Sequence, residues 1–127
     1  NAVYRKPREG RDNIAQFEFL PWILGQCATV QEARTLLAHI NLVDTRFSEQ
    51  FPTSQLHWIL ADRDEAITIE AVGEGLNIYD NPVGVLTNNP PFDKQLFRLN
   101  DYSYLSPDQP VNRFSEQLQL QPYSRGM

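Results

Sequence analysis

Cysteine is almost absent from this 127-residue sequence, in which Cys27 is the single example. One cysteine excludes a disulfide within the chain and is typical of a reducing compartment, so we expect a cytoplasmic protein. The two histidines, His39 and His57, lie far apart in the sequence. No group of Cys and His residues therefore has the spacing of metal ligands, and we expect no metal or other cofactor.

Long apolar runs and positive charge are also scarce. No stretch of about 18 apolar residues is present to span a membrane, and the polar N-terminus lacks the apolar segment of a signal peptide. Eleven Lys and Arg against 16 Asp and Glu give a net charge of −5. This balance argues against a nucleic-acid-binding protein, because phosphate binding needs an excess of cations. The basic run at residues 4–11 contains Pro and Gly and predicts a solvated loop.

Apolar residues are frequent enough to build a core, since 41% of the chain is hydrophobic. The length suits one domain or part of a larger one. The chain begins at Asn1 and stops at Met127 without completing a helix or strand. We interpret both ends as cuts through a longer protein.

Helical periodicity runs through residues 12–42, with Asp12 and Asn13 as candidate caps. A first helix is predicted to begin near Phe19 or Leu20, because Pro21 is tolerated only in a first turn. Thr29 and Glu32 then form the pattern of a capping box at the start of a second helix. The second helix has an apolar stripe and is expected to end at Asn41; the stripe comprises Val30, Ala33, Leu36, Leu37 and Ile40.

Strand patterns follow in the second half of the chain. Residues 56–62, 66–72, 76–80 and 83–87 predict a four-stranded antiparallel meander joined by short turns, and Asp93 is the candidate cap of a further helix. The fold class is therefore α+β. Residues 106–127 are polar and interrupted by proline, and we expect them to form an extended arm that packs on another part of the protein or on another subunit.

No pair of nucleophile and base is visible in these patterns. We expect Cys27 to be a small buried residue on a helix face. His57 is expected to be a core histidine. The hairpin tip at Asp62, Asp64 and Glu65 is expected to be a solvated turn. On these residues alone, a non-catalytic, oligomerising interaction module remains an alternative to an enzyme. The stretch "TNNPP" at 87–91 has two readings. Asn88 and Asn89 either serve a turn or hold an amide in a fixed direction before Pro90 and Pro91.

Three long stretches, "DNIAQFEFLPWILGQCATVQEA", "LHWILADRDEAITIE" and "EGLNIYDNPVGVLTNNPPFDKQL", together resemble the middle of bile salt hydrolases. These belong to the choloylglycine hydrolase family, which also includes penicillin V acylases. The resemblance implies an N-terminal nucleophile hydrolase with an αββα sandwich, of which residues 1–127 are the central portion. It also implies hydrolysis of the amide bond in glycine- or taurine-conjugated bile acids, with penicillin V as the alternative substrate class. Bile salts are favoured because "LPWILGQC" and "LHWILAD" look closest to that branch.

The resemblance assigns one catalytic role within this chain. Asn88 resembles the asparagine of the family's oxyanion site, where its side-chain amide donates to the oxyanion. The family's nucleophile is an N-terminal cysteine, which has no counterpart here, so the chain alone is expected to be inactive without the remaining N- and C-terminal parts of the protein. The resemblance further implies a homotetramer, with residues 106–127 as the assembly arm. Nucleic acid and membrane are not expected as partners.

Overall fold

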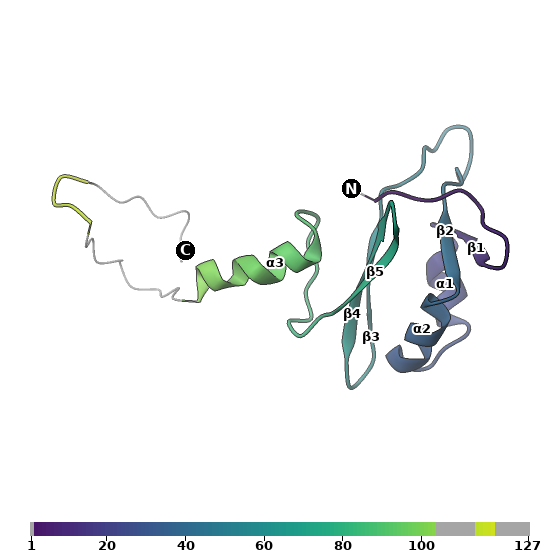
Figure 1. The fold of residues 1–127 in the computed structure, drawn as a ribbon, viewed down its shortest axis with the longest axis horizontal. Coiled ribbons are helices and arrows are strands. Elements are labelled where there is room, and N and C mark those ends of the chain that lie inside the picture. The colour runs from purple at the N-terminus through teal and green to yellow at the C-terminus, as the bar shows by residue number, and fades with distance from the viewer. Residues whose placement is uncertain (1, 104–113, 119–127) are drawn as a thin grey trace. The chain divides into compact units, whose positions relative to one another are not determined.

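A computed structural model describes residues 2–103 and 114–118 of the chain (Figure 1). The described chain divides into two compact units, with the boundary between Asp93 and Lys94. Its elements follow in the order β1 (Asp12–Ala15), α1 (Phe19–Leu24), α2 (Val30–Leu37), β2 (Ile40–Val43), β3 (His57–Ala61), β4 (Ala66–Val72), β5 (Gly75–Asp80), α3 (Phe92–Arg98) and the 3-10 helix η1 (Leu99–Tyr102). No helix in these described ranges is long and apolar enough to cross a membrane.

The helical prediction for residues 12–42 is confirmed in its middle and wrong at both ends. Helices α1 and α2 form as expected, but β1 and β2 flank them and pair in parallel, with Asp12 opposite Ile40. Asn41 does not end a helix. Its side chain is buried and donates to Asn13 Oδ1 at 2.7 Å and to the Lys6 carbonyl at 3.0 Å. All four residues of β2 are buried, so burial on both faces outweighs the helical spacing of this segment.

The predicted cap at Thr29 is confirmed, whereas Glu32 bonds to the residue before the cap, Ala28, and not to the cap itself. Thr29 Oγ1 accepts the amide of Glu32 at 3.2 Å, and Glu32 Oε2 accepts the amide of Ala28 at 2.8 Å. Asp62, from the turn after β3, accepts the Val30 amide at 2.7 Å. Asp62 and Thr29 therefore satisfy first-turn amides that have no partner within the helix, and Glu32 binds the chain just before it.

The turn between β3 and β4 is thus more than the solvated tip predicted from the sequence. Asp62 Oδ1 also accepts the amides of Asp64 and Glu65 at 2.8 and 2.9 Å. These hydrogen bonds, first from Val30 and then from Glu65 and Asp64, lower the pKa of Asp62. Arg34 of α2 pairs with Glu65 at 3.0 Å and with Asp80 of β5. The turn consequently ties the sheet to α2.

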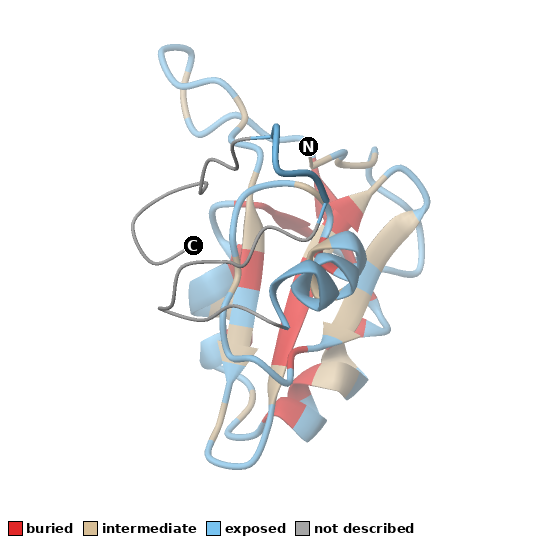
Figure 2. Ribbon diagram, turned by 90° about the vertical axis from the view of Figure 1, so that its left-hand side faces the viewer, coloured by how far each residue is buried: buried red, intermediate tan, exposed pale blue. Residues whose placement is uncertain are grey.

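Strands β3, β4 and β5 form an antiparallel sheet in that order. Alternation along β4 places Ile67 and Ile69 toward the helices, where both are fully buried with Trp58. Phe19 of α1 packs edge-on against Trp58, with ring centroids 4.8 Å apart. Figure 2 shows the buried positions concentrated on the strands and on the helix faces, with exposed positions on the loops. This cluster is the core of the first unit.

The predicted fourth strand at 83–87 is wrong. These residues belong instead to a segment that leaves the sheet after β5. The buried Asn81 side chain accepts the amides of Val83 and Gly84 at 3.3 and 2.9 Å and donates to the Val85 carbonyl at 3.0 Å. Gly84 has a positive φ of 67°. The turn chemistry of Asn81 and Gly84 therefore ends the ladder at β5.

The second unit contains most of α3 and the whole of η1. The helix predicted in this region is confirmed, but it begins at Phe92, so Asp93 lies within its first turn and the prediction of Asp93 as the cap is wrong. Of the arm predicted at residues 106–127, only residues 114–118 are described, and the rest lies outside the described residues. Phe114 and Leu118 are 81% and 50% exposed. They are the two residues that we expect to anchor the arm.

Candidate active site

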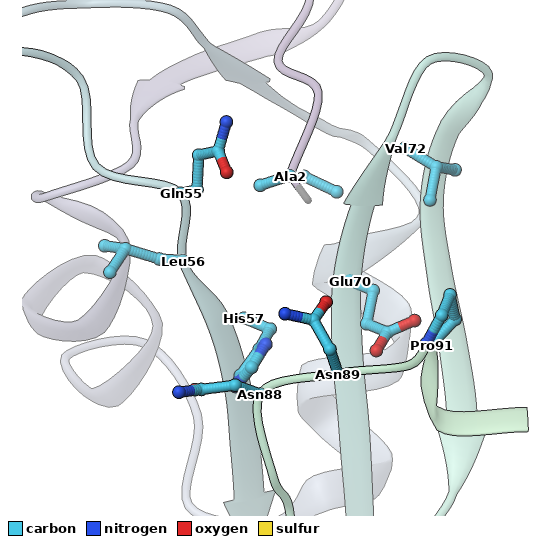
Figure 3. A pocket seen from close by; sticks show the side chains of 10 residues that line it. Ala2, Gln55, Leu56, His57, Glu70, Val72, Asn88, Asn89 and Pro91 are labelled. Carbon is cyan, nitrogen blue, oxygen red and sulfur yellow. The ribbon is translucent and has the colours of Figure 1, made fainter. Parts of the chain in front are cut away.

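A cavity of about 290 Å³ lies beside the end of β4 and contains the asparagine predicted to carry chemistry. Figure 3 shows the lining side chains gathered around one opening. They come from the N-terminal segment, the start of β3, the end of β4 and the segment before α3. The lining comprises Ala2, Gln55, Leu56, His57, Glu70, Ala71, Val72, Asn88, Asn89 and Pro91.

Hydrogen bonds bring the N-terminal segment, β3 and β4 together. The amide of Val3 donates to the Ala71 carbonyl at 3.0 Å, which places the N-terminal segment beside the end of β4. The amide of Leu56 donates to the hydroxyl of Tyr4 at 2.9 Å. The register of the β3–β4 hairpin puts His57 directly opposite Glu70. The cavity is therefore built on the sheet.

The face of the sheet that lines the cavity carries His57, Thr68, Glu70 and Tyr79, and we call it the cavity face. Segment 81–92 passes over it and is joined to β4 at both ends. At its start, Asn81 Nδ2 donates to Thr68 Oγ1 at 3.0 Å. At its end, the amide of Phe92 donates to Glu70 Oε1 at 3.0 Å. Asn88 lies between these two connections, four residues before Phe92.

Asn88 itself is exposed at the mouth of this cavity (Figure 3). Within the part of the chain that the structure describes, no other group is hydrogen-bonded to its side chain. Asn89 and Pro91 line the same cavity, and the Asn89–Pro90 peptide bond is cis. In Figure 3 the side chain of Asn88 lies at the edge of the opening beside His57, and that of Asn89 points into it. An exposed primary amide at the edge of a cavity that is not used by a turn is able to donate to a ligand. The turn in this region is made by Asn81 instead.

His57 is half-buried and lines the cavity, so the prediction of a core histidine is wrong. Glu70 was missed by the sequence reasoning, although the hairpin register contained the signal for it. The connection between β3 and β4 pairs Ala61 with Ala66, and counting outward from this pair places Glu70 opposite His57. Both polar residues therefore belong to the cavity face.

Cys27 lies away from this site. Helix α1 ends at Leu24, so the cysteine belongs to the following turn, is half-buried and does not line the cavity. The predictions of a helical and fully buried position are both wrong. Its thiol donates to the Ile23 carbonyl at 3.0 Å. Burial, followed by the charge of Glu32, raises the pKa of Cys27, which keeps it a thiol near neutral pH.

Comparison with known proteins gives the family. All of residues 1–127 match the model of the linear amide C–N hydrolases, choloylglycine hydrolase family. A bile salt hydrolase/transferase of Lactiplantibacillus plantarum is 56% identical over 126 residues, which are 99% of this chain and 39% of that protein. A bile salt hydrolase/transferase of Clostridium perfringens is 41% identical over 95 residues, which are 74% of this chain and 29% of that protein.

The fold agrees with the same relatives. The crystal structure of a variant of conjugated bile acid hydrolase from Clostridium perfringens matches 98% of this chain and 38% of that chain, with a TM-score of 0.78 and 35% identity. The α+β architecture expected from the sequence is thus confirmed as part of the fold of these hydrolases. Because the family model matches all of residues 1–127, this chain belongs to the choloylglycine hydrolase family of linear amide C–N hydrolases.

Proposed function

We propose that this chain is the central part of an N-terminal nucleophile hydrolase that cleaves the amide bond between a bile acid and glycine or taurine. The observation that carries the proposal is the exposed Asn88 amide at the mouth of a cavity, in a chain that belongs to an amide hydrolase family. Attack on an amide carbon creates an oxyanion, which needs donors already in place. In this proposal, Asn88 Nδ2 is one of those donors.

The nucleophile and the base come from outside residues 1–127. Cys27 is an unsuitable nucleophile because its thiol is engaged with the Ile23 carbonyl, its pKa is raised and it does not line the cavity. An N-terminal cysteine would carry its own base, since an α-amine with a pKa near 8 accepts a proton close to neutral pH. Its thiolate would attack the amide carbon, and Asn88 would stabilise the oxyanion.

Conjugated bile acids are the favoured substrates because the relatives reported above carry bile salt or conjugated bile acid in their names. The test is to incubate the full-length enzyme with glycocholate, taurocholate and phenoxymethylpenicillin and to measure the released glycine, taurine and 6-aminopenicillanic acid. We expect release from the bile salts. Release from the penicillin alone would make the protein a penicillin V acylase, and no release by the folded protein would favour the interaction module.

Assembly and location belong to the same proposal. From the family resemblance we expect a homotetramer in which residues 106–127 contact a neighbouring subunit, and the exposure of the apolar side chains of Phe114 and Leu118 supports such a contact. A chain with a single cysteine fits the reducing cytoplasm. Sedimentation of the full-length protein tests the assembly directly.

A further inference from the structure

Glu70 is the carboxylate of the cavity face that contacts the segment carrying Asn88. We propose that Glu70 is a positioning residue: by accepting the amide of Phe92, it holds residues 88–92 against β4 and so fixes the position of the Asn88 amide at the edge of the cavity. The inference deepens the proposed function and rests on it, because the position of Asn88 matters only if Asn88 acts on a bound substrate.

The hydrogen bond from the Phe92 amide to Glu70 Oε1 measures 3.0 Å and joins residues 22 positions apart. A contact over this distance in the chain fixes the segment relative to the sheet, which local turn geometry alone does not do. The side chain of Phe92 reinforces it, since the ring is 1% exposed and lies 5.9 Å from the ring of Tyr79 on β5. Backbone and side chain of Phe92 are therefore both held on the cavity face.

The carboxylate suits this task because of where β4 places it. Glu70 stands two residues after Thr68, on the same face, so one strand provides both attachment points of segment 81–92. The strand is central in its sheet and pairs with β3 and β5 along its length. A hydrogen bond to a charged acceptor is also stronger than one to a neutral acceptor. Strand β4 thus fixes the position of segment 81–92, which has no regular structure over most of its length.

The consequence for catalysis is geometric. Asn88 lies four positions before Phe92, so a shift at Phe92 is carried to the Asn88 amide along a short length of chain. A misplacement of about 1 Å in a group that stabilises a transition state costs about 100-fold in rate. Loss of the Glu70 acceptor is therefore expected to lower kcat by about 10- to 100-fold while KM changes little.

The experiment compares variants of the full-length enzyme in glycocholate hydrolysis. Glu70→Gln keeps an oxygen acceptor at the same reach, and we expect a kcat within about threefold of wild type. Glu70→Ala removes the acceptor, and Glu70→Asp withdraws it by one methylene; both should lower kcat. Glu74→Ala, in the exposed turn after β4, is the matched control and should leave kcat unchanged. If Glu70→Ala does not fold, Glu70→Asp carries the same test.

A double-mutant cycle separates positioning from a general loss of structure. If Glu70 acts through Asn88, adding Glu70→Ala or Glu70→Asp to the Asn88→Ala variant should lower kcat by no more than about threefold further. The reason is that Asn88→Ala already lacks the amide that Glu70 would position. A full multiplicative loss in the double variant would overturn the inference, as would a Glu70→Gln variant as slow as Glu70→Ala. The failure of the proposed function looks different: Asn88→Ala alone would then keep wild-type kcat.

Discussion

Asn81→Ala is expected to destabilise the protein more than any ordinary turn substitution. The Asn81 side chain is 4% exposed and makes four hydrogen bonds: it accepts two backbone amides and donates to the Val85 carbonyl and to Thr68 Oγ1. Each such bond contributes about 1 kcal/mol net. The amides of Val83 and Gly84 regain water when the side chain is removed, since both residues are exposed, but the fully buried Thr68 hydroxyl does not. The expected loss is therefore about 2–4 kcal/mol.

Urea unfolding of the full-length enzyme, followed by circular dichroism, measures this difference. Asn77→Ala is the matched control, because Asn77 is exposed on β5 and donates one hydrogen bond, to Tyr79 at 3.0 Å. We expect the control to lose no more than about 0.5 kcal/mol. If Asn81→Ala and Asn77→Ala unfold at the same urea concentration with equal slopes, Asn81 does not organise segment 81–92 and the account of the cavity face is wrong.

Three further predictions follow from the same geometry. Cys27→Ala should remain active and lose about 1 kcal/mol of stability, because a half-buried thiol is removed without touching the cavity; loss of activity in the folded variant would contradict the choice of nucleophile. The pKa of Asp62 is lowered, so its bonds to Val30 and the turn stabilise the fold fully above the unfolded-state pKa near 4, and this stabilisation is lost as the pH falls from there through the lower folded-state pKa. Urea unfolding between pH 3 and 7 should show a weaker pH dependence for Asp62→Asn than for wild type, and identical profiles would refute the role of this carboxylate. Replacing Phe114 and Leu118 together by Ser should shift the protein from tetramer toward dimer or monomer in sedimentation, whereas an unchanged tetramer would mean that the arm packs within its own subunit.

The elements that could be predicted from the sequence are those with local signals. The Thr29 cap lies three residues before Glu32, and the alternation along β4 is written in consecutive residues, so both were readable. Strands β1 and β2 were not, because their partners are 28 positions apart and neither has more than four residues. Four residues are too few to show a period, and β2 is in addition buried on both faces.

In the candidate site, too, local sequence patterns were predictable and contacts between distant residues were not. The proposed role of Asn88 rests on the resemblance of its short, continuous motif to that of the family, because the residues alone left a turn as the alternative. The surroundings of Asn88 were not predicted, since segment 83–87 was interpreted as a strand when its apolar residues actually follow the turn made by Asn81. The hairpin register could have placed Glu70 opposite His57, but its contact with Phe92 could not be predicted, because Phe92 is distant in sequence and presents a backbone amide, which has no residue-type signature. Side-chain-to-backbone contacts of this kind become visible only in three dimensions.

The most direct test of the central claim is the steady-state kinetics of Asn88→Ala in the full-length enzyme, with glycocholate as substrate and Asn89→Ala as the neighbouring control. An oxyanion donor acts in the transition state, so we expect kcat to fall by about 100-fold or more while KM stays within about threefold. The control, which lines the same cavity without the proposed role, should retain most of its activity. A kcat for Asn88→Ala within about threefold of wild type would contradict the claim and return Asn88 to a turn residue.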